Sequence, residues 1–186
     1  MTFSRDEHRL SVAPMMEWSD RHYRFLVRQI TQRTLLYTEM IVGEDLLKKD
    51  TEGRALLLDC SPEEFPGLVL QLGGADPTIL RDATQVAVEH AGHPWHSINL
   101  NCGCPSSRVT ESSRQFGARL MHDAEQVREC VTAMASASGG IPITVKCRLG
   151  TDSFHGYENL SNFISTVSGG TGVKHFDIHA RECVLA

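Results

Sequence analysis

The regular alternation of short apolar runs with amphipathic helical patterns is the feature that most constrains the fold. Six runs have the length and apolar density of buried strands, at residues 10–15, 35–41, 68–74, 96–100, 143–148 and 176–180. Helical periodicity follows at residues 20–30, 77–91, 124–138 and 157–167. Between residues 43 and 66 the pattern predicts only a short helix that begins at Leu46. Because parallel strands are buried on both faces and joined by helices, this order predicts an α/β fold of repeated βα units.

Residues at the ends of these segments indicate where the elements begin and end. Asp20 and Asp123 are of the type that caps helix N-termini, and Asp76-Pro77 adds a proline at the first helical position. Pro14 cannot donate to a sheet ladder, so the first strand should end there. The helix after Asp20 has apolar residues spaced for one face, at Tyr23, Phe25, Leu26, Val27 and Ile30, and this face is expected to be buried.

Two parallel architectures use such units, and the sequence favours a barrel. No Gly-x-Gly-x-x-Gly fingerprint of a dinucleotide-binding Rossmann domain follows the first strand. In a (β/α)8 TIM barrel the functional side chains lie at the C-terminal strand ends. Such positions here hold Met16, Gln71, Asn101, Cys104, Lys146, Arg148 and His179. Since a full barrel has eight strands, we expect a TIM barrel truncated after about six βα units, with two unpaired sheet edges.

A loop with unusual chemistry follows the fourth apolar run, in the stretch Asn99-Leu100-Asn101-Cys102-Gly103-Cys104-Pro105-Ser106. A loop that carries a thiol and amides directly after a strand is a typical place for the chemistry of an α/β enzyme. Cys102 and Cys104 are one residue too close for the usual zinc spacing, and no second pair follows, so we expect no metal site. Four of the six thiols are expected to be packing residues, namely Cys60, Cys102, Cys130 and Cys147.

Composition and charge limit the class of protein. The formal net charge is −5, which argues against a strongly basic, nucleic-acid-binding surface. No apolar run approaches the ~18 residues of a membrane span, and the first nine residues lack the apolar core of a secretory signal. Scattered cysteines in a chain of this length indicate reduced thiols. We therefore expect a cytoplasmic protein without a membrane segment.

Seven stretches, taken together and in order, resemble the tRNA-dihydrouridine synthases and, within them, the A-type subfamily. The resemblance runs from about residue 9 to the end, through Ala13-Pro14-Met15 with Trp18-Ser19-Asp20-Arg21-His22, Leu36-Tyr37-Thr38-Glu39-Met40, Leu70-Gln71-Leu72-Gly73-Gly74, Asn99-Leu100-Asn101-Cys102-Gly103-Cys104-Pro105-Ser106, Phe116-Gly117-Ala118, Val145-Lys146-Cys147-Arg148-Leu149-Gly150 and Ile178-His179-Ala180-Arg181.

The resemblance implies a flavin enzyme on a TIM barrel that reduces a uridine in the tRNA D-loop to 5,6-dihydrouridine. NADPH would first reduce the bound FMN. The family's flavin contacts carry over onto Pro14, Met15, Met16, Gln71, Lys146 and His179. Cys104 matches the catalytic cysteine, whereas Asn101 and Arg181 match residues close to the uridine and the RNA.

The chemistry of this reaction agrees with these residue types. Hydride delivered to C6 of the uracil requires a proton at C5 from the opposite face, and an ordinary thiol is still protonated at neutral pH. A stacked uracil must be extruded to reach such a pocket. Lys146 would place positive charge near the N1–C2=O edge of the reduced flavin, where negative charge accumulates.

The resemblance also implies a domain organisation. Residues 1–186 correspond to a partial, FMN-binding TIM-barrel domain, without the last two strands and the C-terminal helical tRNA-binding domain of full members. We expect the 186-residue chain, expressed alone, to retain little FMN and to make no dihydrouridine. Glu182 stands where the subfamily usually has a basic residue, so its carboxylate would repel RNA phosphates.

Two alternatives remain beside the synthase. One is an inactive truncated relative that acts at most as a binding or partner protein. The other is a different FMN TIM-barrel pyrimidine oxidoreductase, similar to dihydroorotate dehydrogenase, which the Asn-x-Gly-Cys-Pro-Ser context disfavours.

Overall fold

One curled parallel sheet organises the chain. The computed structural model describes residues 10–65, 67–90, 92, 95–110 and 115–185. In this part of the chain the strands lie in the order β1-β2-β3-β4-β5-β6, and every neighbouring pair is parallel. Their bounds are β1 Ser11–Val12, β2 Leu35–Val42, β3 Leu68–Gly73, β4 Ser97–Cys102, β5 Ile143–Thr151 and β6 Phe176–Cys183. The predicted α/β class, and a sheet curled like part of a TIM barrel, are confirmed.

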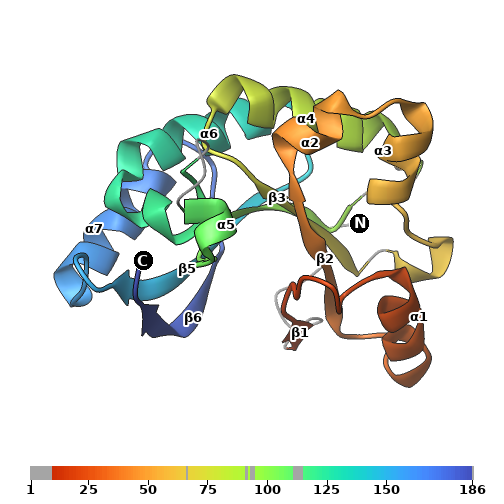
Figure 1. The fold of residues 1–186 in the computed structure, drawn as a ribbon, viewed down its shortest axis with the longest axis horizontal. Coiled ribbons are helices and arrows are strands. Elements are labelled where there is room, and N and C mark those ends of the chain that lie inside the picture. The colour runs from red at the N-terminus through yellow and green to blue at the C-terminus, as the bar shows by residue number, and fades with distance from the viewer. Residues whose placement is uncertain (1–9, 66, 91, 93–94, 111–114, 186) are drawn as a thin grey trace.

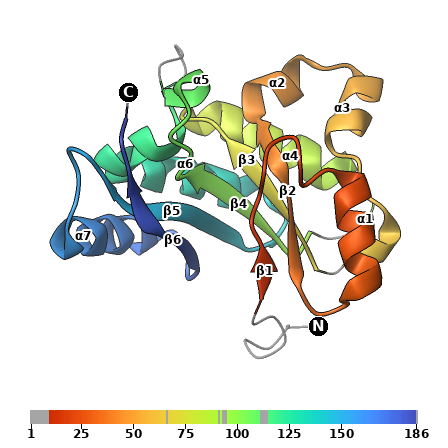
Figure 2. The ribbon, with the colours of Figure 1, turned by 60° about the horizontal axis from the view of Figure 1, so that its bottom comes forward.

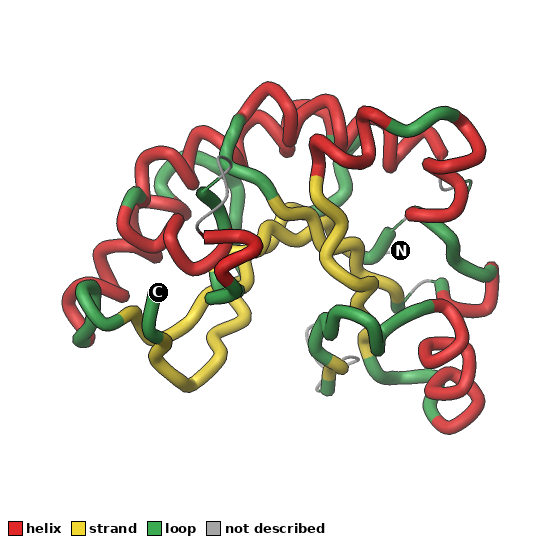
Figure 3. Tube along the Cα trace, viewed as in Figure 1, coloured by secondary structure: helices red, strands yellow, loops and turns green. Residues whose placement is uncertain are grey.

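Most of the helices cover the convex side of this sheet (Figure 1). Their bounds are α1 Arg21–Ile30, α2 Gly43–Lys48, α3 Thr51–Leu57, α4 Pro77–His90, α5 Ser107–Thr110, α6 Ala124–Ala137 and α7 Tyr157–Ser168, with 3-10 turns η1 Pro62–Glu64 and η2 Gly117–His122. Helix α4 packs between α2 and α6, and α6 packs against α7. The molecule is an arch, with strands along its inner side and α4 and α6 along its outer side (Figures 1 and 3).

The predicted helix starts are confirmed by their caps. The Asp20 carboxylate accepts a hydrogen bond from the backbone N–H of Tyr23 at 2.8 Å, and Asp123 accepts from Gln126 at 3.0 Å. Asp76 accepts from the N–H of Ile79 at 3.0 Å, directly before the proline that opens α4. These side chains satisfy amide groups that have no partner within the first turn of a helix.

The hydrophobic core lies between the sheet and the outer helices. Every residue of β3 and β4 is buried, as expected for central parallel strands. Leu70 and Leu100 are fully buried with Leu80 of α4 and Val131 of α6. The thiols of Cys102, Cys130 and Cys147 belong to this core, and Cys60 packs against it, so their prediction as packing residues is confirmed.

The predicted inner face of α1 is wrong for three of its five residues, whereas Val27 packs against the core. Phe25, Leu26 and Ile30 are 52%, 60% and 77% exposed, whereas Arg24 and Arg28 are buried. Arg24 pairs with the buried carboxylate of Glu64 and also donates to the Ser19 carbonyl at 2.8 Å. The helix is therefore anchored by hydrogen-bonded guanidinium groups, which the apolar periodicity could not reveal.

The sheet has two open sides within the described residues. There β1 pairs only with β2, and β6 pairs only with β5. The strands β1 and β2 lie on one side of the arch, whereas β5 and β6 lie on the other (Figure 2). No helix in the described part of the chain has the length and apolar character needed to cross a membrane.

Candidate active site

The C-terminal ends of the strands converge on one cavity of about 690 Å³. Eight of the nine site residues predicted from the sequence line this cavity: Pro14, Met15, Met16, Gln71, Asn101, Cys104, Lys146 and His179. The exception is Arg181. Arg181 instead lines a neighbouring cavity of about 460 Å³, together with Arg148, Glu182 and Cys183. Arg148 lines both cavities, so the two spaces meet at this side chain.

A chain of amide hydrogen bonds crosses the strands beneath this cavity. Asn101 Nδ2 donates to Gln71 Oε1 at 2.9 Å, and Gln71 Nε2 donates to Asn99 Oδ1 at 2.8 Å. Asn99 Nδ2 donates in turn to Thr144 Oγ1 at 2.8 Å. The three amide side chains are buried, so these bonds satisfy polar groups that have left water and fix their orientation.

The same network holds the loop that carries Cys104. Asn101 Oδ1 accepts hydrogen bonds from the backbone N–H groups of Gly103 at 3.0 Å and Cys104 at 2.9 Å. Arg148 Nε donates to the Gly103 carbonyl at 2.6 Å, and Ala118 N donates to the Cys104 carbonyl at 2.8 Å. The half-buried thiol therefore stands on a backbone that is fixed from β4, β5 and η2.

The loop with Met15 and Met16 is held from two sides. Ser19 Oγ accepts from Met15 N at 2.9 Å and donates to the Met15 carbonyl at 3.1 Å. Glu17 has a φ of 65°, and its N–H donates to the Glu39 carboxylate on β2. A non-glycine residue in this region is strained, and the surrounding hydrogen bonds maintain it. Met16, the preceding residue, is 57% exposed.

Two basic side chains contribute charge to the cavity. Burial lowers the pKa of Lys146 below its ordinary value, and the carboxylate of Asp177 opposes that shift. Within the described residues, Lys146 Nζ has no hydrogen-bond acceptor. Desolvation lowers the pKa of His179, and the positive charges of Arg148 and Lys146 lower it further. His179 is exposed on β6, and the lowered pKa favours its neutral form.

The size and lining of the cavity fit a cofactor such as a flavin. Sites for cofactors usually enclose about 300–1,000 Å³, with apolar walls and a few fixed polar groups. Met16, Met40, Val42 and Phe116 supply the apolar wall, whereas the amides and the half-buried Lys146 ammonium supply the polar side. Such an ammonium fits the electron-rich N1–C2=O edge of an isoalloxazine ring.

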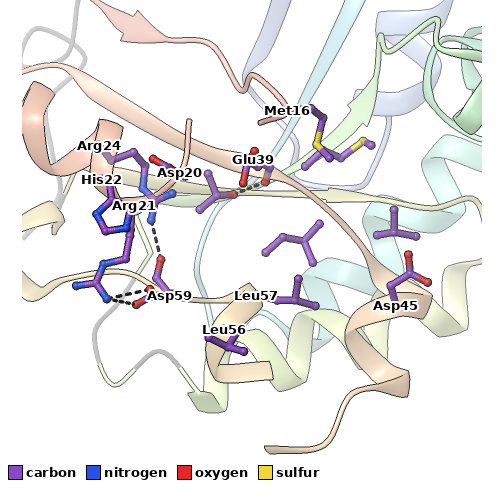
Figure 4. Close-up of a pocket in the computed structure, with 14 residues that line it drawn as sticks. Met16, Asp20, Arg21, His22, Arg24, Glu39, Asp45, Leu56, Leu57 and Asp59 are labelled. Carbon is purple, nitrogen blue, oxygen red and sulfur yellow. Dashed lines mark hydrogen bonds and ion pairs between the residues drawn. The ribbon is translucent and has the colours of Figure 1, made fainter. Parts of the chain in front are cut away.

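A second cavity, of about 440 Å³, lies on the other side of Met16. It shares Met16, Met40, Val42 and Asp45 with the first cavity. Figure 4 shows Met16 at one end of this space and the Arg21–Asp59 pair at the other. Arg21 Nη1 donates to both carboxylate oxygens of Asp59, at 3.1 and 2.9 Å. The sequence did not predict this space, because its walls come from α1, β2 and the unpredicted α3.

Sequence reasoning also missed residues that organise the main site. Asn99 belongs to the central motif but is not among the predicted site residues, although its spacing from Asn101 places both on one strand face. Glu39 and Phe116 lie in recognised motifs, yet their contacts with Glu17 N and with the cavity are tertiary. No local pattern indicates such contacts.

Comparison with known proteins identifies the family. The model of the family "Dihydrouridine synthase (Dus)" matches residues 11–184. The chain is 47% identical over 178 residues to the tRNA-dihydrouridine(20/20a) synthase of Synechocystis sp., covering 95% of this chain and 49% of the relative. It is 44% identical to the proteins of that name from Escherichia coli O6:H1 and Xanthomonas axonopodis pv. citri, covering 96% and 100% of this chain and 51% and 53% of the relatives. The chain thus spans about half the length of these relatives, and it belongs to the dihydrouridine synthase family.

Proposed function

We propose that this chain carries the catalytic, flavin-binding part of a tRNA uridine reductase that forms 5,6-dihydrouridine in the D-loop. One observation carries this proposal: the Cys104 thiol lines a single cavity together with Gln71, Lys146 and His179. The relatives are named for tRNA positions 20/20a, which makes a uridine there the preferred substrate. These relatives are bacterial, and we place the reaction in the cytoplasm.

Pro14, Met15 and Met16 would support one face of the FMN ring, with Gln71 beside it. When bound and reduced by NADPH, FMN supplies a hydride to C6 of the uracil. Lys146 would hold a positive charge against the N1–C2=O edge, and neutral His179 would offer a hydrogen bond. Because the Gln71 amide is already oriented by Asn99 and Asn101, binding would need little rearrangement of this side chain.

Cys104 would act as the general acid. Its Sγ–H bond breaks as the proton moves to C5 of the uracil, and the hydride that arrives at C6 completes the saturated bond. Asn101 fixes the backbone of this loop and so positions the thiol. The target base must leave its stack to enter the cavity. Arg148, which lines both cavities, and Arg181, which lines the neighbouring cavity, would contact the RNA backbone.

The experiment incubates the protein with excess FMN, NADPH and unmodified tRNA, and measures dihydrouridine by mass spectrometry of the nucleosides. With FMN in excess we expect dihydrouridine from the natural sequence, which departs from the expectation drawn from the missing strands, because Cys104, Gln71, Lys146 and His179 line one cavity. Asn101→Ala should form about 100-fold less, because the thiol loses its positioning amide. Asn159→Ala is the matched control, since this exposed amide bonds only within α7 and the residues before it. Binding of tRNA without any dihydrouridine would overturn the proposal and favour an inactive binding relative.

A further inference from the structure

A hydrogen bond connects two distant strands across the concave side of the sheet. Tyr37 of β2 donates its hydroxyl proton to Asp177 Oδ2 of β6 at 2.5 Å. Strands β2 and β6 are separated by β3, β4 and β5 in the sheet. Strands β2 and β6 lie on opposite sides of the arch (Figure 2), so this bond links its two sides. Neither residue lines the main cavity, and both lie near the N-terminal ends of their strands.

The bond places a carboxylate beside the strand that carries Lys146. Lys146 and Asp177 are direct register partners in the parallel pair β5–β6. Tyr37 is 4% exposed, and the other oxygen of Asp177 contacts His175 Nε2 at 3.1 Å. The carboxylate of Asp177 is therefore held from two sides. These contacts fix it although, within the described residues, β6 has a neighbouring strand on one side only.

We propose that Asp177, held by Tyr37, is the counter-ion that keeps the Lys146 ammonium charged for its contact with the flavin. A buried ammonium loses hydration, and a nearby carboxylate restores part of the lost stabilisation. The charged group that faces this pair is Arg148 from β5, which opposes the ammonium, and the titratable groups are His175 and His179 from β6. Asp177 is thus a positioning residue, and this role rests on the proposed function of the site.

The test follows the titration of Lys146 in the chain without flavin or RNA. The chain has lysines at positions 48, 49, 146 and 174, so reductive methylation with ¹³C-formaldehyde gives few NMR signals, and Lys146→Arg identifies the relevant one. We expect Asp177→Asn to lower the pKa of Lys146 further, which multiplies its neutral fraction at pH 8 by about three- to tenfold. Asp177→Glu should restore most of the charge effect, and Tyr37→Phe should give a smaller decrease than Asp177→Asn.

Asp152→Asn is the matched control, because it removes one carboxylate near β5 and β6 that does not act on Lys146. An Asp177→Asn titration of Lys146 identical to that of Asp152→Asn would overturn the proposal. If Asp177→Asn unfolds the protein, the pKa of Lys146 will instead rise towards the ordinary lysine value. In that case the titration of Lys146 in Asp177→Glu, which keeps the carboxylate, decides between the two outcomes. Since no flavin or tRNA is present, failure here is distinct from failure of the proposed reaction.

Discussion

Gly117 shows, at the scale of a single residue, how closely the chain packs around Cys104. It has a φ of 71°, and a Cβ built on it would lie 2.5 Å from the Cys104 carbonyl oxygen. That oxygen accepts the hydrogen bond from Ala118 N, so it cannot move without releasing the loop. The Phe116-Gly117-Ala118 motif is therefore explained by close approach of two backbone segments as well as by a left-handed conformation.

We predict that Gly117→Ala lowers dihydrouridine formation by about 100-fold, because the added methyl group displaces the backbone of Cys104, the proposed general acid. Gly140→Ala is the matched control, since Gly140 has a φ of 89° but no atom of the described residues lies within 4 Å of the methyl group that alanine would add. Both changes impose left-handed strain of about 1–2 kcal/mol. Equal activity in the two variants, measured as dihydrouridine per tRNA, would contradict the positioning role of Gly117.

At the scale of elements, the buried ion pair between α1 and η1 connects the scaffold to the Met15 loop. Arg24 and Glu64 have side chains that are 4% and 1% exposed. The second carboxylate oxygen of Glu64 accepts from Ser61 N at 2.6 Å, and Arg24 also donates to the Asp59 carbonyl at 2.7 Å. Ser19, whose carbonyl accepts from Arg24, is the residue that fixes Met15.

We predict that Glu64→Ala destabilises the protein by about 3–5 kcal/mol, because it leaves a buried guanidinium without its counter-charge. The exposed pair Glu125–Arg128, with an N–O distance of 2.6 Å, is the control, and Glu125→Ala should cost less than about 0.5 kcal/mol. Urea unfolding followed by circular dichroism measures both values. Similar small losses for the two variants would show that the buried pair does not anchor α1.

The elements also show what the sequence could predict. Apolar runs located every strand of the described residues, and the signal is densest in β3 and β4, which are buried on both faces. The runs underestimated the lengths of β5 and β6. The pairing of these strands continues through Gly150↔Glu182 and Thr151↔Cys183, where polar or small residues interrupt the apolar pattern. Helix α3 was missed because it contributes no fully buried residue, so no apolar face marks it.

The candidate site was predictable to the extent that its residues follow strand ends. That rule located Gln71, Asn101 and Lys146, which the structure brings to one cavity. It could not locate Asp177 or Glu39, whose partners Tyr37 and Glu17 are contacts between elements distant in sequence. The rule also could not distinguish Arg181 from the residues of the main cavity, although Arg181 lines the neighbouring cavity.

At the scale of the whole molecule, Tyr37 links the two sides of the arch and makes stability depend on pH. Burial, and then the negative charge of Asp177, raise the pKa of Tyr37 above its ordinary value. In the unfolded chain a tyrosine ionises near pH 10, so above that pH the unfolded state binds fewer protons than the folded state. The stabilisation from Tyr37 is therefore complete below about pH 10 and is lost as pH rises beyond it.

We predict that Tyr37→Phe flattens the alkaline decline in the free energy of unfolding. The difference in the free energy of unfolding between the natural sequence and the variant should shrink by up to about 1.4 kcal/mol per pH unit above pH 10. Tyr157, which is 84% exposed, is the control, and Tyr157→Phe should leave the pH dependence unchanged. Urea unfolding at pH values from 8 to about 11 measures these differences. If the free energy of unfolding falls with pH in parallel for all three proteins, the Tyr37–Asp177 bond is not the source of the alkaline decline.

Reoxidation of the reduced flavin by tRNA decides whether Cys104 is the proton donor. The protein is loaded with excess FMN, reduced by NADPH, and then mixed rapidly with unmodified tRNA. For Cys104→Ala we predict reduction by NADPH within about twofold of the natural sequence and tRNA-dependent reoxidation at least about 100-fold slower. Cys60→Ala, which changes a thiol packed against the core, should leave both rates intact. Reoxidation of Cys104→Ala at the natural rate, or loss of both half-reactions together, would contradict the assignment of the acid to Cys104.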